Sequence, residues 1–135
     1  MKETSNIIDE LKKYFSKRKD IALAFLFGSV AKGRQISESD VDIAVWFFGD
    51  EFLEKATETQ REIETLLHKD VDLIVLNSAR PTIAWAALRG KALLIRDQRL
   101  YFNQLLEVST EAEDMQDFNL DLFRMRQKNR AKVSN

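Results

Sequence analysis

Residues 21–48 read "IALAFLFGSVAKGRQISESDVDIAVWFF", and this stretch decides the fold. Two unbroken apolar runs flank a polar turn that opens with Gly28. Apolar runs of this length, with turn residues at their ends, predict strands that are covered on both faces. Two acids, Asp40 and Asp42, stand where the second run begins. The sequence therefore predicts two buried strands, the second of which carries a pair of carboxylates at its start.

Hydrophobic periodicity predicts the other elements. The fold class is α/β in the wide sense (α+β), a small mixed sheet of about four strands with helices packed on it and a helical segment at the C-terminal end. The expected strands cover 21–27, 41–48, 71–76 and 92–95. The expected helices cover 5–18, about 50–68, a segment that begins near Pro81 and is capped by Gly90, and the chain from Gln98 onward.

The chain is expected to divide at the end of the fourth strand. Residues 1–97 hold the sheet, and residues 98–135 form a helical extension that is either part of the same domain or a partner-docking element. Packing and docking remain equal alternatives for this extension, because little other chain is left to cover its apolar stripe. The stripe consists of Met115, Phe118, Leu122 and Met125.

Composition narrows the classes of function. The 135 residues carry a net charge of −1, so we expect neither a basic groove for nucleic acid nor attraction to an acidic membrane. No apolar run approaches the ~20 residues of a membrane span, and the charged beginning of the chain does not resemble a signal peptide. Cysteine is absent, which agrees with a reducing compartment. We expect a cytoplasmic domain.

Three aspartates form the predicted metal site. Residues two apart in a strand point to the same side, ~6–7 Å apart, so Asp40 and Asp42 direct their carboxylates into one small volume. Asp72 lies at the edge of the next apolar strand, and three carboxylates converge if the two strands are neighbours. Carboxylate oxygens are the ligands that Mg²⁺ prefers, and such a set can hold two cations ~4 Å apart for phosphoryl or nucleotidyl transfer.

The turn after the first strand is the predicted phosphate site. Gly28 lets the backbone approach a ligand closely, and Ser29 adds a hydroxyl donor. Lys32 and Arg34 follow, either as balancing charges for a polyphosphate or as solvated turn cations; both readings stay open. The pattern from Gly28 to Gly33 disfavours a P-loop, because that motif requires Lys and then Ser or Thr where this chain has Arg34 and Gln35.

The stretch "GSVAKGRQISESDVDIAV" resembles a known family. Its "GS" at 28–29, ten intervening residues and "DVD" at 40–42 are similar to the signature of the DNA polymerase β-like nucleotidyltransferases. The match extends to Asp72 as a third acid, and the short chain resembles the minimal nucleotidyltransferases of the MntA antitoxin type. Such antitoxins are paired with HEPN-domain ribonuclease toxins. The resemblance implies the nucleotidyltransferase fold.

The resemblance also implies roles for individual residues. Asp40, Asp42 and Asp72 would be the catalytic residues that ligate two Mg²⁺ ions, with Asp72 helping to activate the incoming hydroxyl. Gly28 and Ser29 would bind the β and γ phosphates of the nucleotide. The predicted nucleotide-binding set consists of Gly28, Ser29, Lys32, Arg34 and Ser39.

The activity implied is that of an antitoxin. AMP would pass from ATP to a tyrosine of a HEPN toxin, pyrophosphate would leave, and the toxin would be silenced. Two alternatives remain: transfer to a small molecule such as an aminoglycoside, and a non-catalytic module that neutralises the toxin by contact. The expected partners are the toxin and ATP, with no membrane and no direct nucleic-acid binding. The C-terminal helix is a candidate contact for a homo- or hetero-oligomer.

Overall fold

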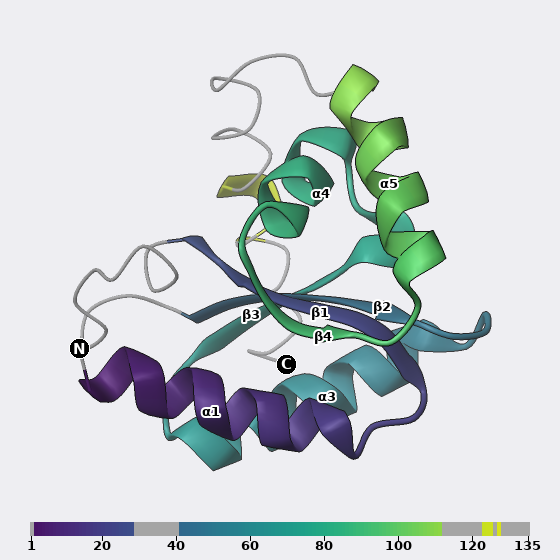
Figure 1. Cartoon of the computed structure of the whole chain (residues 1–135). Helices are drawn as coiled ribbons and strands as arrows, with labels where there is room; N and C mark the ends of the chain where they lie inside the picture. The colour runs from purple at the N-terminus through teal and green to yellow at the C-terminus, as the bar shows by residue number, and fades with distance from the viewer. Residues whose placement is uncertain (1, 29–40, 112–122, 126, 128–135) are drawn as a thin grey trace.

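The structure is a computed structural model that describes residues 2–28, 41–111, 123–125 and 127 (Figure 1). Strands and helices follow one another along the chain much as the hydrophobic pattern predicts. Their bounds are α1 Lys2–Ser16, β1 Ile21–Phe27, β2 Val41–Phe47, α3 Phe52–Leu67, β3 Val71–Val75, a 3₁₀ turn Leu76–Ser78, α4 Pro81–Leu88, β4 Lys91–Ile95 and α5 Gln98–Glu111.

The described strands form one sheet in the order β3-β2-β1-β4 (Figure 1). The strand β1 is antiparallel to both of its neighbours, β2 and β4. The strands β2 and β3 are parallel, and α3 is the crossover between them. A parallel pair requires such a crossover, because both strands must begin at the same edge of the sheet. The predicted mixed sheet of four strands is confirmed.

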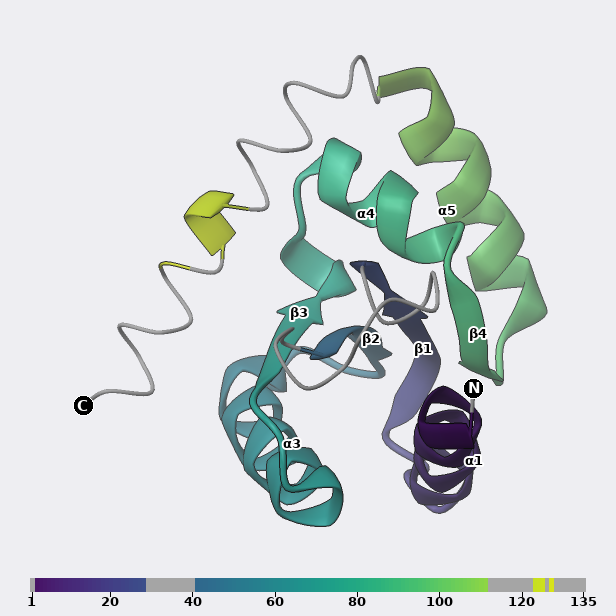
Figure 2. The same ribbon diagram turned by 90° about the vertical axis from the view of Figure 1, so that its left-hand side faces the viewer.

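Helices cover both faces of this sheet. Figure 2 shows α1 and α3 on one side of the strands and α4 with α5 on the other. The strands therefore supply side chains to two separate cores, one on each face, which accounts for the unbroken apolar runs. The α1/α3 core includes Leu11, Phe15, Ile43, Phe47 and Ile63, and the α4/α5 core includes Phe25, Ile74, Ile83, Leu88 and Val108. None of the helices in the described ranges combines the length and the apolarity that crossing a membrane demands.

The third strand ends one residue earlier than predicted, and a side chain takes part in ending it. The strand β3 ends at Val75, because the Asn77 amide takes over the pairing and bonds both the N–H and the carbonyl of Phe47, each at 2.9 Å. Pro81 occupies the first turn of α4, as predicted. Gly90 follows the helix end, where its N–H donates to the carbonyl of Ala87. A side chain at Gly90 would lie 2.5 Å from the Leu26 carbonyl oxygen, so close packing against β1 also requires glycine there.

The C-terminal extension is described only in part. The helix α5 packs against α4 and contributes Val108 to the core. Met125 packs against the same core, so this member of the predicted stripe contacts the domain. The other three members, Met115, Phe118 and Leu122, lie outside the described residues.

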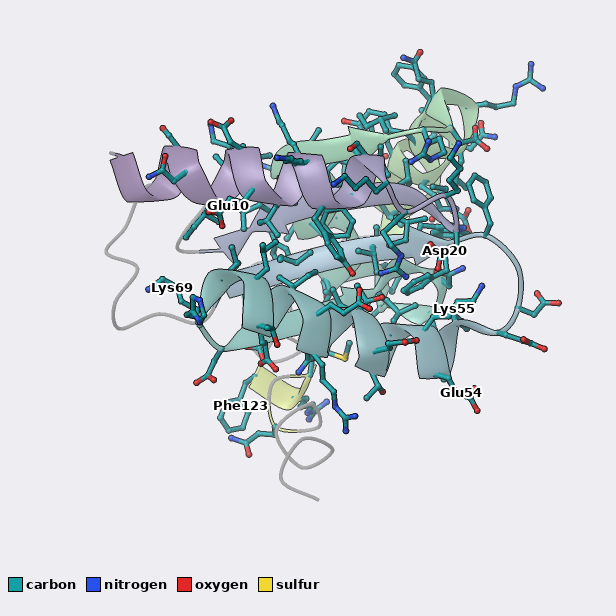
Figure 3. All side chains as sticks on the ribbon, turned by 90° about the horizontal axis from the view of Figure 1, so that it is seen from below. Glu10, Asp20, Glu54, Lys55, Lys69 and Phe123 are labelled. Carbon is teal, nitrogen blue, oxygen red and sulfur yellow. The ribbon has the colours of Figure 1, made fainter. Side chains whose placement is uncertain are left out.

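A polar cluster joins α1, α3 and the turn before β1. The Tyr14 hydroxyl donates to Glu62 at 2.6 Å, and the Arg18 guanidinium donates two bonds of 2.9 and 2.8 Å to Asp20. Burial, followed by the hydrogen bond to Glu62, raises the pKa of Tyr14 to about 12, so its hydroxyl stays a donor at neutral pH. The hydrogen bonds from Arg18 lower the pKa of Asp20 from its ordinary value of 3.8. Figure 3 shows Asp20 and Lys55 at one end of the sheet and Lys69 at the other.

This cluster predicts a pH-dependent contribution to stability. Because folding lowers the pKa of Asp20, its ion pair stabilises the protein above about pH 4, and the stabilisation is lost as the pH falls below 3.8. Asp20→Asn should lower the free energy of unfolding by ~0.5–1 kcal/mol at pH 7, a modest figure because the pair is partly exposed. Urea titrations at pH 7 and at pH 3 measure the difference, which should be smaller at pH 3 than at pH 7. Asp9→Asn, an exposed change on α1, is the control, and an equal loss there would contradict the prediction.

Candidate functional site

The pairing of β2 with β3 brings two of the predicted acids together. In the parallel register Asp42 lies directly opposite Asp72, between the pairs Val41 with Val71 and Ile43 with Leu73. Neighbouring strands are ~4.8 Å apart, so the two backbones hold the acids at adjacent positions. The expectation that these strands are neighbours is confirmed.

Both acids point to the same side of the sheet. Val41 and Ile43 belong to the α1/α3 core, so Asp42 between them faces α4. Asp72 alternates in the same way between Val71 and Leu73. Strand alternation places every second side chain on one face, so the two carboxylates share the α4 face of the sheet. The third predicted acid, Asp40, lies outside the described residues.

Gly28 is packed against the first of these acids. It follows the last residue of β1, Phe27, which is the register partner of Asp42. Its φ of +77° is a left-handed conformation that favours glycine. A Cβ built on Gly28 would lie 2.2 Å from Oδ2 of Asp42. The structure thus gives a reason for glycine at this position that the sequence did not predict: it makes room for a carboxylate.

The two acids are buried far more than aspartate usually is. Asp42 is fully buried, and Asp72 exposes only 5% of its surface. Like charges at adjacent buried positions repel, and removing each from water carries a further cost. A divalent cation offsets both effects, and the oxygen donors present are those that Mg²⁺ or Mn²⁺ prefers. The donor chemistry of Asp42 and Asp72 therefore fits a hard divalent cation.

Several predicted site residues cannot be placed. Within the described ranges, no group of three or more His, Cys, Asp or Glu side chains is arranged to hold a metal ion. The remaining members of the predicted set lie outside those ranges, and their roles stay predictions. They are Ser29, Lys32, Arg34, Ser39 and Asp40.

One polar contact at the site was missed in the sequence. Glu64 lies in the last turn of α3, and its Oε2 accepts a hydrogen bond of 3.0 Å from the N–H of Val71, the residue before Asp72. A carboxylate near a helix C-terminus is disfavoured by the helix dipole, so the sequence did contain a signal at this position. No spacing rule connects that signal to Val71.

Comparison with known proteins assigns this fold to the nucleotidyltransferases. A family model described as polymerase beta, nucleotidyltransferase, matches residues 9–99. The chain is also 34% identical, over 89 residues, to the protein adenylyltransferase MntA of Thermococcus cleftensis; the match covers 66% of this chain and 90% of that one. The chain therefore belongs to the polymerase β-type nucleotidyltransferase family, and it is an enzyme of that class.

Solved structures agree with this assignment. A toxin–antitoxin complex with AMP-PNP contains a chain that superposes with a TM-score of 0.65 at 25% identity, covering 94% of this chain and 99% of that one. A chain of the complex between the tri-AMPylated HEPN toxin of Shewanella oneidensis and an MNT antitoxin superposes with a TM-score of 0.56 at 23% identity. The latter match covers 98% of this chain and 97% of that one, and it supports the fold.

The contact between Gly28 and Asp42 can be tested with a matched pair of glycines. Gly28 and Gly49 both have positive φ, but a Cβ on Gly49 would have nothing within 4 Å. Gly49→Ala should cost only backbone strain, ~1–2 kcal/mol of unfolding free energy. Gly28→Ala should cost ~1–3 kcal/mol more, because the Asp42 carboxylate must move inside a packed interior. Chemical denaturation measures both, and equal losses would show that the carboxylate moves freely.

Proposed function

We propose that this protein is an antitoxin that transfers AMP from ATP to a tyrosine hydroxyl of a HEPN ribonuclease toxin. The observation that carries the proposal is the buried pair of Asp42 and Asp72, placed in register on one face beside the Gly28 turn. This pair occupies the positions at which the family resemblance predicts catalytic acids.

The relatives support this choice of substrate and partner. One relative is named protein adenylyltransferase MntA, and its match covers 90% of that chain. One structural neighbour is a toxin–antitoxin complex with AMP-PNP, and another contains an AMPylated HEPN toxin. We extend these three properties (nucleotide, modification and partner) to this chain as parts of the proposal.

The reaction joins the tyrosine oxygen to the α-phosphorus of ATP. A new P–O bond forms, the bond from the α-phosphorus to the bridging oxygen breaks, and pyrophosphate carries away the electron pair. The phenol proton, with an ordinary pKa near 10, must be removed as the oxygen attacks. Asp72 is the proposed acceptor of that proton, since it is the more exposed of the two described acids.

Asp42 and Asp72, with Asp40, are the proposed ligands of two Mg²⁺ ions. Bound there, Mg²⁺ would neutralise the phosphate charge and lower the pKa of the attacking hydroxyl. The protein's own part is to hold the acids rigidly. Both acids belong to hydrogen-bonded strands, and these strands lie between two packed cores. Ser29, Lys32, Arg34 and Ser39 complete the proposed nucleotide site.

The proposal predicts the outcome of two isosteric changes. Asp42→Asn and Asp72→Asn should each reduce AMP transfer by at least ~100-fold, because each removes a charge that positions the reacting groups. Both variants should remain folded, since each change relieves repulsion between buried like charges. Purified protein, MgATP and the HEPN toxin are incubated, and the intact mass of the toxin reports the AMP added.

A nearby acid provides the control for these variants. Asp70 is exposed and lies two residues before Asp72, and its backbone carbonyl, which the substitution leaves in place, accepts a hydrogen bond from the N–H of Val41. Asp70→Asn should therefore leave AMP transfer unchanged. Transfer that persists at the wild-type rate in Asp42→Asn or in Asp72→Asn would refute the proposed mechanism. Tight toxin binding without any gain of mass would instead favour the non-catalytic module.

A further inference from the structure

One peptide unit links α3 to both strands of the acid pair. The unit between Asp70 and Val71 has its carbonyl at 3.1 Å from the N–H of Val41, which donates to it. The N–H of the same unit donates to Oε2 of Glu64 at 3.0 Å. Val41 immediately precedes Asp42, and Val71 immediately precedes Asp72. The peptide between Asp70 and Val71, held by these two hydrogen bonds, is thus adjacent to both acids.

The two hydrogen bonds, to Val41 and to Glu64, lie on opposite sides of this peptide. In a trans peptide the C=O and the N–H point in opposite directions, and the described residues contain no cis bond. The carbonyl faces β2, so the N–H faces away from β2. Within the described sheet β3 has β2 as its one neighbour, so no other strand is there to accept that N–H. The Glu64 carboxylate supplies the acceptor that a further strand would otherwise provide.

The main chain of Glu64 fixes the same turn. Its carbonyl accepts a hydrogen bond of 2.8 Å from the N–H of His68, which caps α3 with a left-handed φ of 54°. Glu64 therefore holds the turn at two points, His68 and Val71, and the entry of β3 cannot shift without breaking one of them. A hydrogen bond to a charged group is roughly twice as strong as a neutral one, which suits this task.

We propose that Glu64 is a positioning residue that sets the separation of the Asp42 and Asp72 carboxylates, and with it the affinity of the pair for a divalent cation. This inference rests on the proposed function in one respect, that the acid pair binds the cation. Glu64 acts through the 70–71 peptide and contacts neither nucleotide nor acceptor. Its carboxylate could be replaced by any side chain that offers an acceptor oxygen at the same place.

A set of variants separates positioning from general stabilisation. Glu64→Gln keeps an acceptor oxygen, Glu64→Ala removes it, and Glu64→Leu removes it while keeping comparable size should the alanine variant fail to fold. Glu62→Ala is the matched control: this residue lies two positions before Glu64 on the same helix, but its side chain accepts a hydrogen bond from Tyr14 of α1. Asp42→Asn provides the reference for loss of the cation site.

The primary readout is the binding of Mn²⁺ alone, by calorimetric titration of the full chain. Glu64→Ala or Glu64→Leu should weaken Mn²⁺ binding by ~10-fold or more, the range seen when a group supporting a metal ligand is removed. Glu64→Gln should restore most of the affinity, and Glu62→Ala should leave it unchanged. Amide hydrogen exchange at Val71 should accelerate in the alanine and leucine variants only.

Each outcome decides one of the two proposals. Mn²⁺ affinity equal to wild type in the variants without an acceptor would overturn the role of Glu64, as would an equal loss in Glu62→Ala. The role of Glu64 would also be overturned if the wild-type protein bound no Mn²⁺, or if it bound Mn²⁺ no more tightly than Asp42→Asn does. If Mn²⁺ binds as expected and depends on Glu64, but no AMP reaches the toxin, the proposed function fails while the inference about Glu64 stands.

Discussion

The parallel pairing of β2 with β3 is the constraint on which the rest of the molecule depends. It places Asp42 opposite Asp72 on one face of the sheet, and a slip of one residue would move one of the two acids to the other face. The register is held by what surrounds it. Alternate residues of both strands are locked into the α1/α3 core, and Asn77 and Glu64 bond the backbone near the two ends of the pair.

Burying two neighbouring carboxylates costs free energy that the rest of the fold must supply. Both cores contribute, since the strands are covered on two sides by large apolar side chains. The site is tightly packed at Gly28, because the Asp42 carboxylate occupies the space that a side chain at this position would need. On the proposal that this pair binds a divalent cation, the protein should be less stable without the cation than with it, because a ligand that binds only the folded state stabilises that state.

Much of the fold could be predicted because its strands are buried on both faces. The runs 21–27 and 92–95 mark β1 and all but the first residue of β4. The helix α1 begins earlier than predicted, at Lys2, because its first turn is polar and adds nothing to the apolar period. The acid pair could be predicted because Asp42 and Asp72 each stand near the start of an apolar run that reads as a strand. Its exact neighbours were not, since the contacts of Gly28 with Asp42 and of Glu64 with Val71 join residues that no local pattern relates.

The crossover helix α3 connects the two acid-bearing strands, and this makes its length part of the site. Each residue added to a helix turns everything beyond it by about 100° and advances it by about 1.5 Å. An insertion within α3 before Glu64 would thus carry the carboxylate away from Val71, although no residue of the acid pair had changed. Length variation is better tolerated at Gly49–Glu51, an exposed turn before the helix. Redesign of this scaffold should therefore lengthen that turn and leave the helix intact.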